Sequence, residues 1–262
     1  PGRPRLRGRV AHGLRPVLVV GVGHAEVGLA VVDEDLVARL LGEGGVDLGA
    51  LVRNVGVVAK RPVVGAQAPV DAGVDVQRGA VSTAGGAVGS VVAQIAKIKG
   101  CYVVGSTGAD DKAQWLRDEA GLDAVINYKT QDLAKALEAA TPKGIDVYFE
   151  NVGGAHLDAA LARMNLRGRI AVCGMISTYN GGGEGVRNLS NMIYSRIRME
   201  GFVASDFPHL QAQFVEDMTG WLKAGQVKYQ ETILDGFERA PEGLIGLFSG
   251  LNSGKMLIRV AA

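Results

Sequence analysis

The stretch Thr83-Ala84-Gly85-Gly86-Ala87-Val88-Gly89-Ser90 is the clearest structural signal in this chain. It follows a short apolar segment and leads into the amphipathic run Val91-Val92-Ala93-Gln94-Ile95-Ala96-Lys97. Small residues at 84–87 let the backbone approach a pyrophosphate, whose charge the unpaired N–H groups of a helix start can receive, and Gly89 allows close helix–sheet contact. Because the spacing is Ala-x-Gly-x-x-Gly, an ordinary tight turn remains an alternative to a nucleotide site.

Beyond this turn, short apolar runs alternate with amphipathic segments. The alternation predicts strands at Ala80–Thr83, Tyr102–Gly105, Ala124–Asn127, Asp146–Glu150 and Arg169–Cys173. It predicts helices at Val88–Lys99, Asp111–Ala120, Asp132–Ala140 and Leu157–Met164, and later elements at Leu210–Lys223, Pro241–Phe248 and Lys255–Val260. Helices of this length connect parallel strands by right-handed crossovers, so we expect an α/β fold with a doubly wound parallel (Rossmann) sheet.

The N-terminal third has an abnormal composition. Residues 1–80 contain no aromatic residue and no Ile, Ser, Thr, Met or Cys, whereas ordinary domains use the whole alphabet. The abundant Arg, Gly, Ala and Val have codons rich in guanine and cytosine, so translation in a wrong frame and a divergent small domain are both open explanations. We therefore divide the chain into an unassigned segment at 1–78, a nucleotide-binding domain at 79–235, and a C-terminal helix and strand at 236–262.

One part of this N-terminal segment imitates a second dinucleotide turn. Val17-Leu18-Val19-Val20-Gly21-Val22-Gly23-His24 has the pattern of a strand that enters a glycine turn. However, Glu26 stands where the third glycine is needed, and its carboxylate would repel a pyrophosphate. We discount this turn and interpret His12 and His24 as surface residues.

Charge and hydropathy exclude several classes of partner. Lys plus Arg number 28 and Asp plus Glu number 27, so the net charge of +1 offers no field for nucleic acid or an anionic membrane. No stretch approaches the roughly 20 apolar residues of a membrane span. We expect a protein that binds neither nucleic acid nor membranes.

The cysteines and histidines do not form a metal pattern. Cys101 and Cys173 lie far apart without a CxxC pair, which disfavours both a disulfide framework and a structural zinc site. His156 follows Gly153-Gly154 and is interpreted as a helix-start residue rather than a ligand. We predict no metal and a reducing, cytoplasmic location.

The end of the second predicted strand bears on which nucleotide binds. An NAD site places an acid there to bind the ribose hydroxyls, whereas this chain has Gly105-Ser106. Asp110 lies beyond the strand and is expected to cap the next helix. Lys112 and Tyr128 could face a 2′-phosphate, but from the residues alone a solvated lysine and a packed tyrosine explain them equally well.

From Val81 onward the chain resembles the zinc-independent medium-chain dehydrogenase/reductases, specifically the prostaglandin reductase group of NADP-dependent alkenal/one oxidoreductases. The motifs that carry the resemblance occur in order along the chain: Ala84-Gly85-Gly86-Ala87-Val88-Gly89-Ser90-Val91-Val92, Gln94-Ile95-Ala96-Lys97, Lys99-Gly100-Cys101, Asn127-Tyr128-Lys129-Thr130, Asp146-Val147-Tyr148-Phe149-Glu150-Asn151-Val152-Gly153-Gly154, Gly168-Arg169-Ile170-Ala171-Val172-Cys173-Gly174-Met175-Ile176-Ser177-Thr178-Tyr179-Asn180, Arg198-Met199-Glu200-Gly201-Phe202 and Asn252-Ser253-Gly254-Lys255.

The resemblance implies NADP(H) as the cofactor, with Lys112 and Tyr128 on its 2′-phosphate. The cofactor-binding residues that it implies are Gly86, Ala87, Val88, Gly89, Lys112, Tyr128, Asn151, Cys173, Gly174, Ile176, Ser177, Thr178, Tyr179, Phe202, Val203 and Asn252. Cys173 and Phe202 are also apolar enough to serve the core alone, and Asn252 is also typical of a turn.

The family reduces the carbon–carbon double bond of α,β-unsaturated ketones and aldehydes, which implies enone or alkenal reduction here. Hydride adds to the β-carbon, and the resulting enolate needs a hydrogen-bond donor. The resemblance implies Tyr194 and Tyr179 at the substrate end, and we favour Tyr194 as the donor with Tyr179 in support. The alternative is that both tyrosines pack against the cofactor without transferring a proton. The alternative functions are nucleotide binding without catalysis and quinone reduction.

The resemblance fails in the N-terminal third, which does not match the family's GroES-like β domain. Gln77-Arg78-Gly79-Ala80 stands where the first buried strand needs β-branched residues, so we expect a weakened strand. Because the β domain would close one wall of the substrate pocket, we expect NADPH affinity to be retained in part and turnover to be impaired or absent. The C-terminal run would lack its partner and expose Leu244, Leu247, Phe248 and Ile258. We therefore expect self-association into a homo-oligomer.

Overall fold

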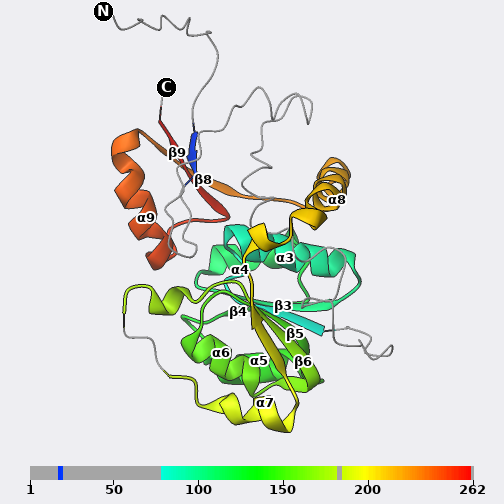
Figure 1. Cartoon of the computed structure of the whole chain (residues 1–262). Helices are drawn as coiled ribbons and strands as arrows, with labels where there is room; N and C mark the ends of the chain where they lie inside the picture. The colour runs from blue at the N-terminus through cyan, green and yellow to red at the C-terminus, as the bar shows by residue number, and fades with distance from the viewer. Residues whose placement is uncertain (1–16, 20–77, 182–184, 261–262) are drawn as a thin grey trace, which may run out of the picture.

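A computed structural model describes residues 17–19, 78–181 and 185–260 (Figure 1). Its main feature is a six-stranded parallel sheet in the order β4-β3-β2-β5-β6-β7. These strands are β2 (Arg78–Val81), β3 (Tyr102–Thr107), β4 (Ala124–Asn127), β5 (Ile145–Glu150), β6 (Met164–Val172) and β7 (Arg198–Gly201). The chain moves outward from β2 to one side and then returns to the other through β5, so the switch point lies between β2 and β5. The predicted Rossmann sheet is confirmed.

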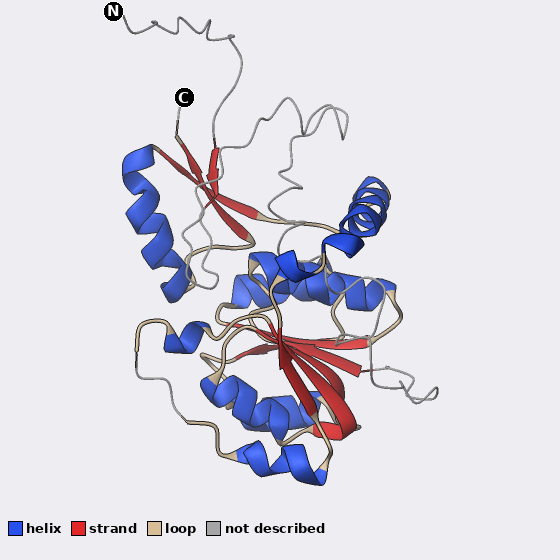
Figure 2. Cartoon of the chain, in the orientation of Figure 1, coloured by secondary structure: helices blue, strands red, loops and turns tan. Residues whose placement is uncertain are grey.

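Helices cover both faces of this sheet, as Figure 2 shows. The crossover helices are α3 (Ala87–Ile98), α4 (Asp110–Asp118), α5 (Leu133–Ala140) and α6 (Gly154–Leu161). Successive strand residues point to opposite faces, so Val103 and Phe149 pack with α3 and α4, whereas Val104 and Tyr148 pack with α5 and α6. The expected helix at Leu157–Met164 is displaced: α6 starts earlier, and Met164 already begins β6.

The strand β2 forms despite its unfavourable composition. Arg78 begins the strand, where its backbone N–H donates to Asp146 Oδ2 at 3.1 Å and its guanidinium pairs with the same carboxylate at 3.5 Å. The strand pairs in parallel with both β3 and β5, including at Gly79. Polar pairing at the strand start therefore offsets the missing apolar side chains. The expected strand end at Thr83 is wrong, because Thr83 has left-handed φ of 52° and belongs to the following turn.

A second, smaller unit follows the Rossmann sheet. It contains β8 (Glu231–Asp235), α9 (Ala240–Ser249) and β9 (Lys255–Arg259), and β9 runs parallel to β8 and antiparallel to β1 (Val17–Val19). The helix α8 (Gln211–Lys223) precedes this unit and packs through Phe214 and Met218 into the core on the α3 face of the Rossmann sheet. The remaining short elements are η1 (Ile176–Thr178), η2 (Asn188–Ser190), α7 (Asn191–Tyr194), η3 (Ala204–Asp206), η4 (Pro208–Leu210) and η5 (Phe237–Arg239). The sequence patterns did not predict β7 or β8.

The C-terminal unit has a core of its own. Ile258 and Met256 are fully buried with Leu234, and Leu244 and Leu247 pack against them from α9. The expectation that Ile258, Leu244 and Leu247 form an exposed patch is therefore wrong, because α9 covers one face of the β8–β9 pair. Of the four residues expected to be exposed, only Phe248 is exposed.

The N-terminal predictions are mostly outside the described residues. Val17–Val19 form β1 and pair with β9, in agreement with the first part of the predicted strand. His12, His24 and Glu26 lie outside the described residues. Among the residues that the structure describes, no helix has the length and apolar character needed to span a membrane.

Candidate functional site

The glycine turn between β2 and α3 lies at the switch point of the sheet. Gly86 caps α3 without a side-chain hydrogen bond, and the first turn of the helix carries no acidic residue. A Cβ at Gly89 would collide with the carbonyl oxygen of Thr83 and lie 2.9 Å from the Cα of Ala84. Only glycine permits this close approach, as the spacing predicted. The helix start therefore presents backbone N–H groups, without a competing carboxylate, to an anion.

The turn after β3 has glycine for a steric reason. A Cβ at Gly108 would lie only 2.7 Å from the hydroxyl oxygen of Tyr128 and 3.2 Å from Cε of Lys129. The phenol hydroxyl thus lies against Gly108, just beyond the end of β3, the strand end where NAD sites carry an acidic side chain. Burial raises the pKa of Tyr128, so the hydroxyl remains a hydrogen-bond donor at neutral pH.

Asp110 does not cap α4. The N-cap is Ala109, and Asp110 is the first helical residue. Its carboxylate instead accepts a hydrogen bond from Asn127 Nδ2 at 2.7 Å. The expected capping role is wrong because the helix starts one residue earlier than predicted, and Asp110 ties α4 to the end of β4.

Lys112 lies at the same edge of the sheet as the glycine turn. A Cβ at Gly85 would lie 3.2 Å from its Cδ, and its ammonium donates to the carbonyl oxygen of Gly250 at 2.7 Å. Burial lowers the pKa of Lys112; the negative charge of Asp111 opposes this, and the positive charge of Lys129 adds to it. Two positive charges and a hydroxyl donor therefore lie near the carboxyl end of β3, from Lys112, Lys129 and Tyr128.

The end of β5 is held by a buried carboxylate that the sequence analysis missed. Glu150 is fully buried, and its Oε1 accepts from Ser82 Oγ at 2.8 Å and from the backbone N–H of Val152 at 2.5 Å. Asn151 donates through its backbone N–H to Ser82 Oγ and through Nδ2 to the Ser82 carbonyl oxygen. This network joins the ends of β2 and β5 across the switch point. The only signal in the sequence was an acid directly before Asn151.

The loop after β6 folds against the loop after β5. Cys173 and Gly174 both donate backbone N–H groups to the carbonyl oxygen of Glu150, and Ile176 donates to that of Asn151. Ser177 donates through its backbone N–H and its Oγ to the Val152 carbonyl oxygen, and Thr178 Oγ1 donates to the Met175 carbonyl oxygen. The backbone N–H of Met175 donates to the Tyr179 hydroxyl. Burial raises the pKa of Cys173 to about 11, so its thiol stays neutral and is a poor nucleophile at neutral pH.

Two further segments approach this edge. Gly254 donates its backbone N–H to the carbonyl oxygen of Gly85 at 3.0 Å, and Asn252 Nδ2 donates to the carbonyl oxygen of Gly254 at 2.6 Å. Phe202 follows β7 and packs edge-on against Phe149, with ring centroids 6.0 Å apart, while the neighbouring Val203 is exposed. The structure thus brings the predicted cofactor residues together from seven separate segments.

Tyr194 does not join them. It ends α7, which directly precedes β7, and the next residue, Ser195, accepts a hydrogen bond from the backbone N–H of Arg167 in β6. Because β6 and β7 are parallel, α7 lies at the amino edge of the sheet, opposite the glycine turn. Tyr194 is 74% exposed there, whereas Tyr179 lies at the carboxyl edge.

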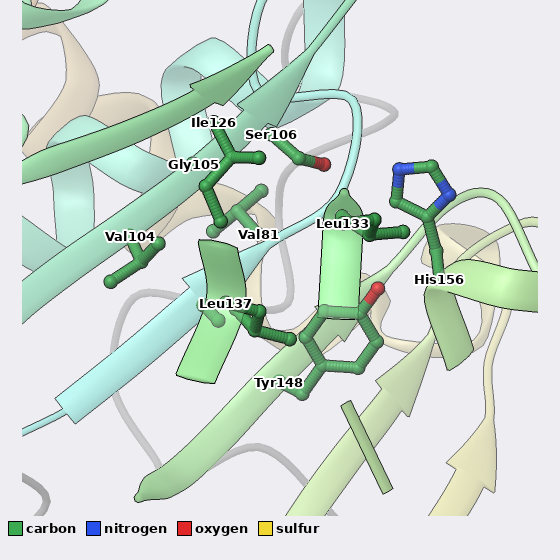
Figure 3. Close-up of a pocket in the computed structure, with 10 residues that line it drawn as sticks. Val81, Val104, Gly105, Ser106, Ile126, Leu133, Leu137, Tyr148 and His156 are labelled. Carbon is green, nitrogen blue, oxygen red and sulfur yellow. The ribbon is translucent and has the colours of Figure 1, made fainter. Parts of the chain in front are cut away.

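A small pocket opens on the α5–α6 face of the sheet (Figure 3). Ser106 on β3, Tyr148 on β5 and His156 on the first turn of α6 contribute its polar groups, and apolar side chains complete its wall. Ser106 Oγ and His156 Nε2 are buried without a hydrogen-bond partner. Burial lowers the pKa of His156 to about 4, so the imidazole is neutral at pH 7.

Neither Cys101 nor Cys173 forms a disulfide bond. Over the described ranges, no three His, Cys, Asp or Glu side chains are grouped in a way that could hold a metal ion.

The glycine turn at the switch point of this strand order defines the class: a dinucleotide-binding α/β protein. Residues 87–223 match the family described as zinc-binding dehydrogenase, and the chain belongs to that family. The resemblance to its prostaglandin reductase group is confirmed by the relatives described next.

The chain is 53% identical over 183 residues to the 2-alkenal reductase (NADP(+)-dependent) of Nicotiana tabacum, covering 69% of this chain and 53% of that protein. It is 42% identical to prostaglandin reductase 1 of Rattus norvegicus, covering 68% of this chain and 55% of that one. The crystal structure of CurA from Vibrio vulnificus in complex with NADPH aligns with a TM-score of 0.67 and 41% identity, over 71% of this chain and 57% of CurA. The chain spans about half the length of these relatives.

Proposed function

We propose that this chain binds NADPH at the carboxyl edge of its sheet and takes part in reducing the carbon–carbon double bond of α,β-unsaturated ketones or aldehydes. The observation that carries the proposal is the arrangement beyond the end of β3. There the Tyr128 hydroxyl lies against Gly108, and the Lys112 side chain passes Gly85 with its ammonium on the Gly250 carbonyl oxygen. The chain carries glycine at this position instead of an acid that would bind the ribose of NAD, and a 2′-phosphate here would meet a cation and a hydroxyl donor. The names of the relatives support the same cofactor and reaction.

In this proposal, the first turn of α3 holds the pyrophosphate. Gly86, Ala87, Val88 and Gly89 present their backbone to it, and Asn252 approaches from the C-terminal loop. Asn151 and the residues 173–179 would line the ribose and nicotinamide end, with Phe202 and Val203 beside them. NADPH supplies the hydride. The chain orients the cofactor and supplies hydrogen-bond donors to the substrate.

We propose Tyr179 as a hydroxyl group of this edge that can meet the substrate carbonyl. Its hydroxyl accepts a hydrogen bond from the backbone N–H of Met175 at 3.4 Å, so its own proton is available for donation. Tyr194 can serve as donor only if a second copy of the chain brings it to this edge.

The free edge of β7 offers a way to do so. In the residues described here, β7 pairs with β6 on one side only, and exposed Leu189, Ile193 and Tyr194 adjoin it. Two-fold antiparallel pairing of two β7 strands would set the amino edge of one sheet beside the carboxyl edge of the other. We therefore propose a homodimer, in place of self-association through the C-terminal unit. A reducing location such as the cytoplasm fits two cysteines that form no disulfide bond.

Titration of the purified chain with NADPH, followed by nicotinamide fluorescence, tests binding. Oxidation of NADPH in the presence of an enone tests the reaction, and a parallel assay with a quinone tests the related alternative. A chain that binds NADPH but turns over neither substrate would support binding without catalysis. The position of Tyr194 away from the cofactor edge favours this second function in a monomer.

A further inference from the structure

His156 packs against the tyrosine that faces the proposed 2′-phosphate position. The imidazole and the Tyr128 ring form an edge-to-face pair, with centroids 4.9 Å apart and planes at 82°. His156 belongs to the first turn of α6, whereas Tyr128 follows β4, so the contact joins two separate segments. The Tyr128 backbone is already fixed, because its N–H donates to the Thr107 carbonyl oxygen at 3.1 Å. The imidazole therefore restrains the remaining freedom, which is the direction of the phenol ring.

The environment of His156 indicates that this side chain supports Tyr128 through ring packing, not through charge or hydrogen bonding. Nε2 is buried and has no hydrogen-bond partner, although Ser106 Oγ lines the same pocket (Figure 3). The ring contributes no positive charge near neutral pH. A neutral ring whose buried nitrogen makes no hydrogen bond supports its neighbour by packing, and an apolar ring of similar size would do the same.

We propose that His156 is a positioning residue for Tyr128 and thereby contributes to the preference for NADPH over NADH. With the phenol ring held against the imidazole, the hydroxyl stays over Gly108, where the 2′-phosphate would be bound. The inference rests on the proposed function of this edge. It assigns His156 no contact with the cofactor itself.

The test compares His156→Ala, His156→Phe, Tyr128→Phe and the double variant His156→Ala/Tyr128→Phe by titration with NADPH and NADH. His156→Ala should weaken NADPH binding about three- to tenfold, the range expected for an aromatic pair, and leave NADH binding unchanged. His156→Phe should restore NADPH binding. In the Tyr128→Phe background, His156→Ala should cause no further loss, since the hydroxyl that it positions is gone.

Equal losses of both nucleotides, no rescue by Phe, or additive effects in the double variant would each overturn the inference. So would a Tyr128→Phe variant that keeps the full preference for NADPH. The matched control is His209→Ala, an exposed histidine on η4, which should change neither affinity. If His156→Ala does not fold, His156→Asn removes the ring but keeps a polar group at the pocket, and the same losses are expected. A wild-type chain that binds neither nucleotide would instead refute the proposed function.

Discussion

The turn between β2 and α3 can be tested by adding a single methyl group. In Gly89→Ala, the new Cβ would collide with the Thr83 carbonyl oxygen and lie 2.9 Å from both the Thr83 carbonyl carbon and the Ala84 Cα. All three are backbone atoms, so no side chain can rotate away. The helix α3 and the turn must separate before alanine can be accommodated.

The size of the effect follows from two opposing contributions. Replacing glycine by alanine inside a helix stabilises the folded state by about 0.5–1 kcal/mol. Overpacking a tight contact destabilises it by about 1–3 kcal/mol, and backbone neighbours favour the upper part of that range. We expect Gly89→Ala to lower the free energy of unfolding by about 1–2 kcal/mol and to weaken NADPH binding at least tenfold, because the displaced helix start carries the pyrophosphate N–H groups.

Urea unfolding and NADPH titration measure the two effects separately. The matched control is Gly220→Ala in α8, where a Cβ would meet nothing within 4 Å. That variant should be more stable than the wild type and bind NADPH normally. If Gly89→Ala is as stable as the wild type and retains its NADPH affinity, the assignment of this turn as the pyrophosphate site is refuted.

Three further predictions concern single side chains. Lys112→Ala should weaken NADPH at least tenfold and NADH little, since only NADPH has the 2′-phosphate; equal losses in titrations would contradict this. Glu150→Ala should lower the free energy of unfolding by about 2–4 kcal/mol in urea, with Glu150→Gln milder, because the buried Ser82 hydroxyl and the partly buried Val152 N–H lose their acceptor. In Cys101→Ser, the remaining Cys173 should be alkylated slowly at pH 8 and faster toward pH 11, because only the thiolate reacts. The contribution of the buried neutral thiol to the free energy of unfolding should be present below about pH 9 and lost as the pH rises through about 11.

The sheet and its glycine turn could be predicted because their signals are local. Apolar runs separated by helices of crossover length fix the parallel sheet, and Gly89 is required by a contact within a few residues of it. The strands β7 and β8 escaped because each is short and half-exposed, with little periodicity. Ile258 was misjudged because its burial depends on α9 folding back over β9, a contact that no local pattern encodes.

The candidate site was predictable only in part for the same reason. Lys112 and Tyr128 could be named as candidates for a 2′-phosphate site. The close approach of the Tyr128 hydroxyl to Gly108, however, exists only after β3 and β4 are paired. The Ser82–Glu150 hydrogen bond joins residues 68 positions apart, across two strands that become neighbours through the switch in chain direction. Tyr194 was grouped with Tyr179, although it ends α7, which precedes β7 at the opposite edge of the sheet.

The residues proposed to bind NADPH and one proposed proton donor, Tyr194, lie at opposite edges of the sheet. The groups proposed to hold NADPH all follow strand ends or approach them from the C-terminal loop, and all lie within residues 82–254 that β2 to β9 position. The proposed proton donors do not share this edge within one copy, because Tyr194 precedes β7 while Tyr179 follows β6. Binding therefore depends on the fold of one chain, whereas proton donation by Tyr194 depends on pairing of two. A variant that blocks the free edge of β7, such as Met199→Pro, should leave NADPH affinity largely intact and reduce enone turnover, if the chain has any, in parallel with the loss of dimer.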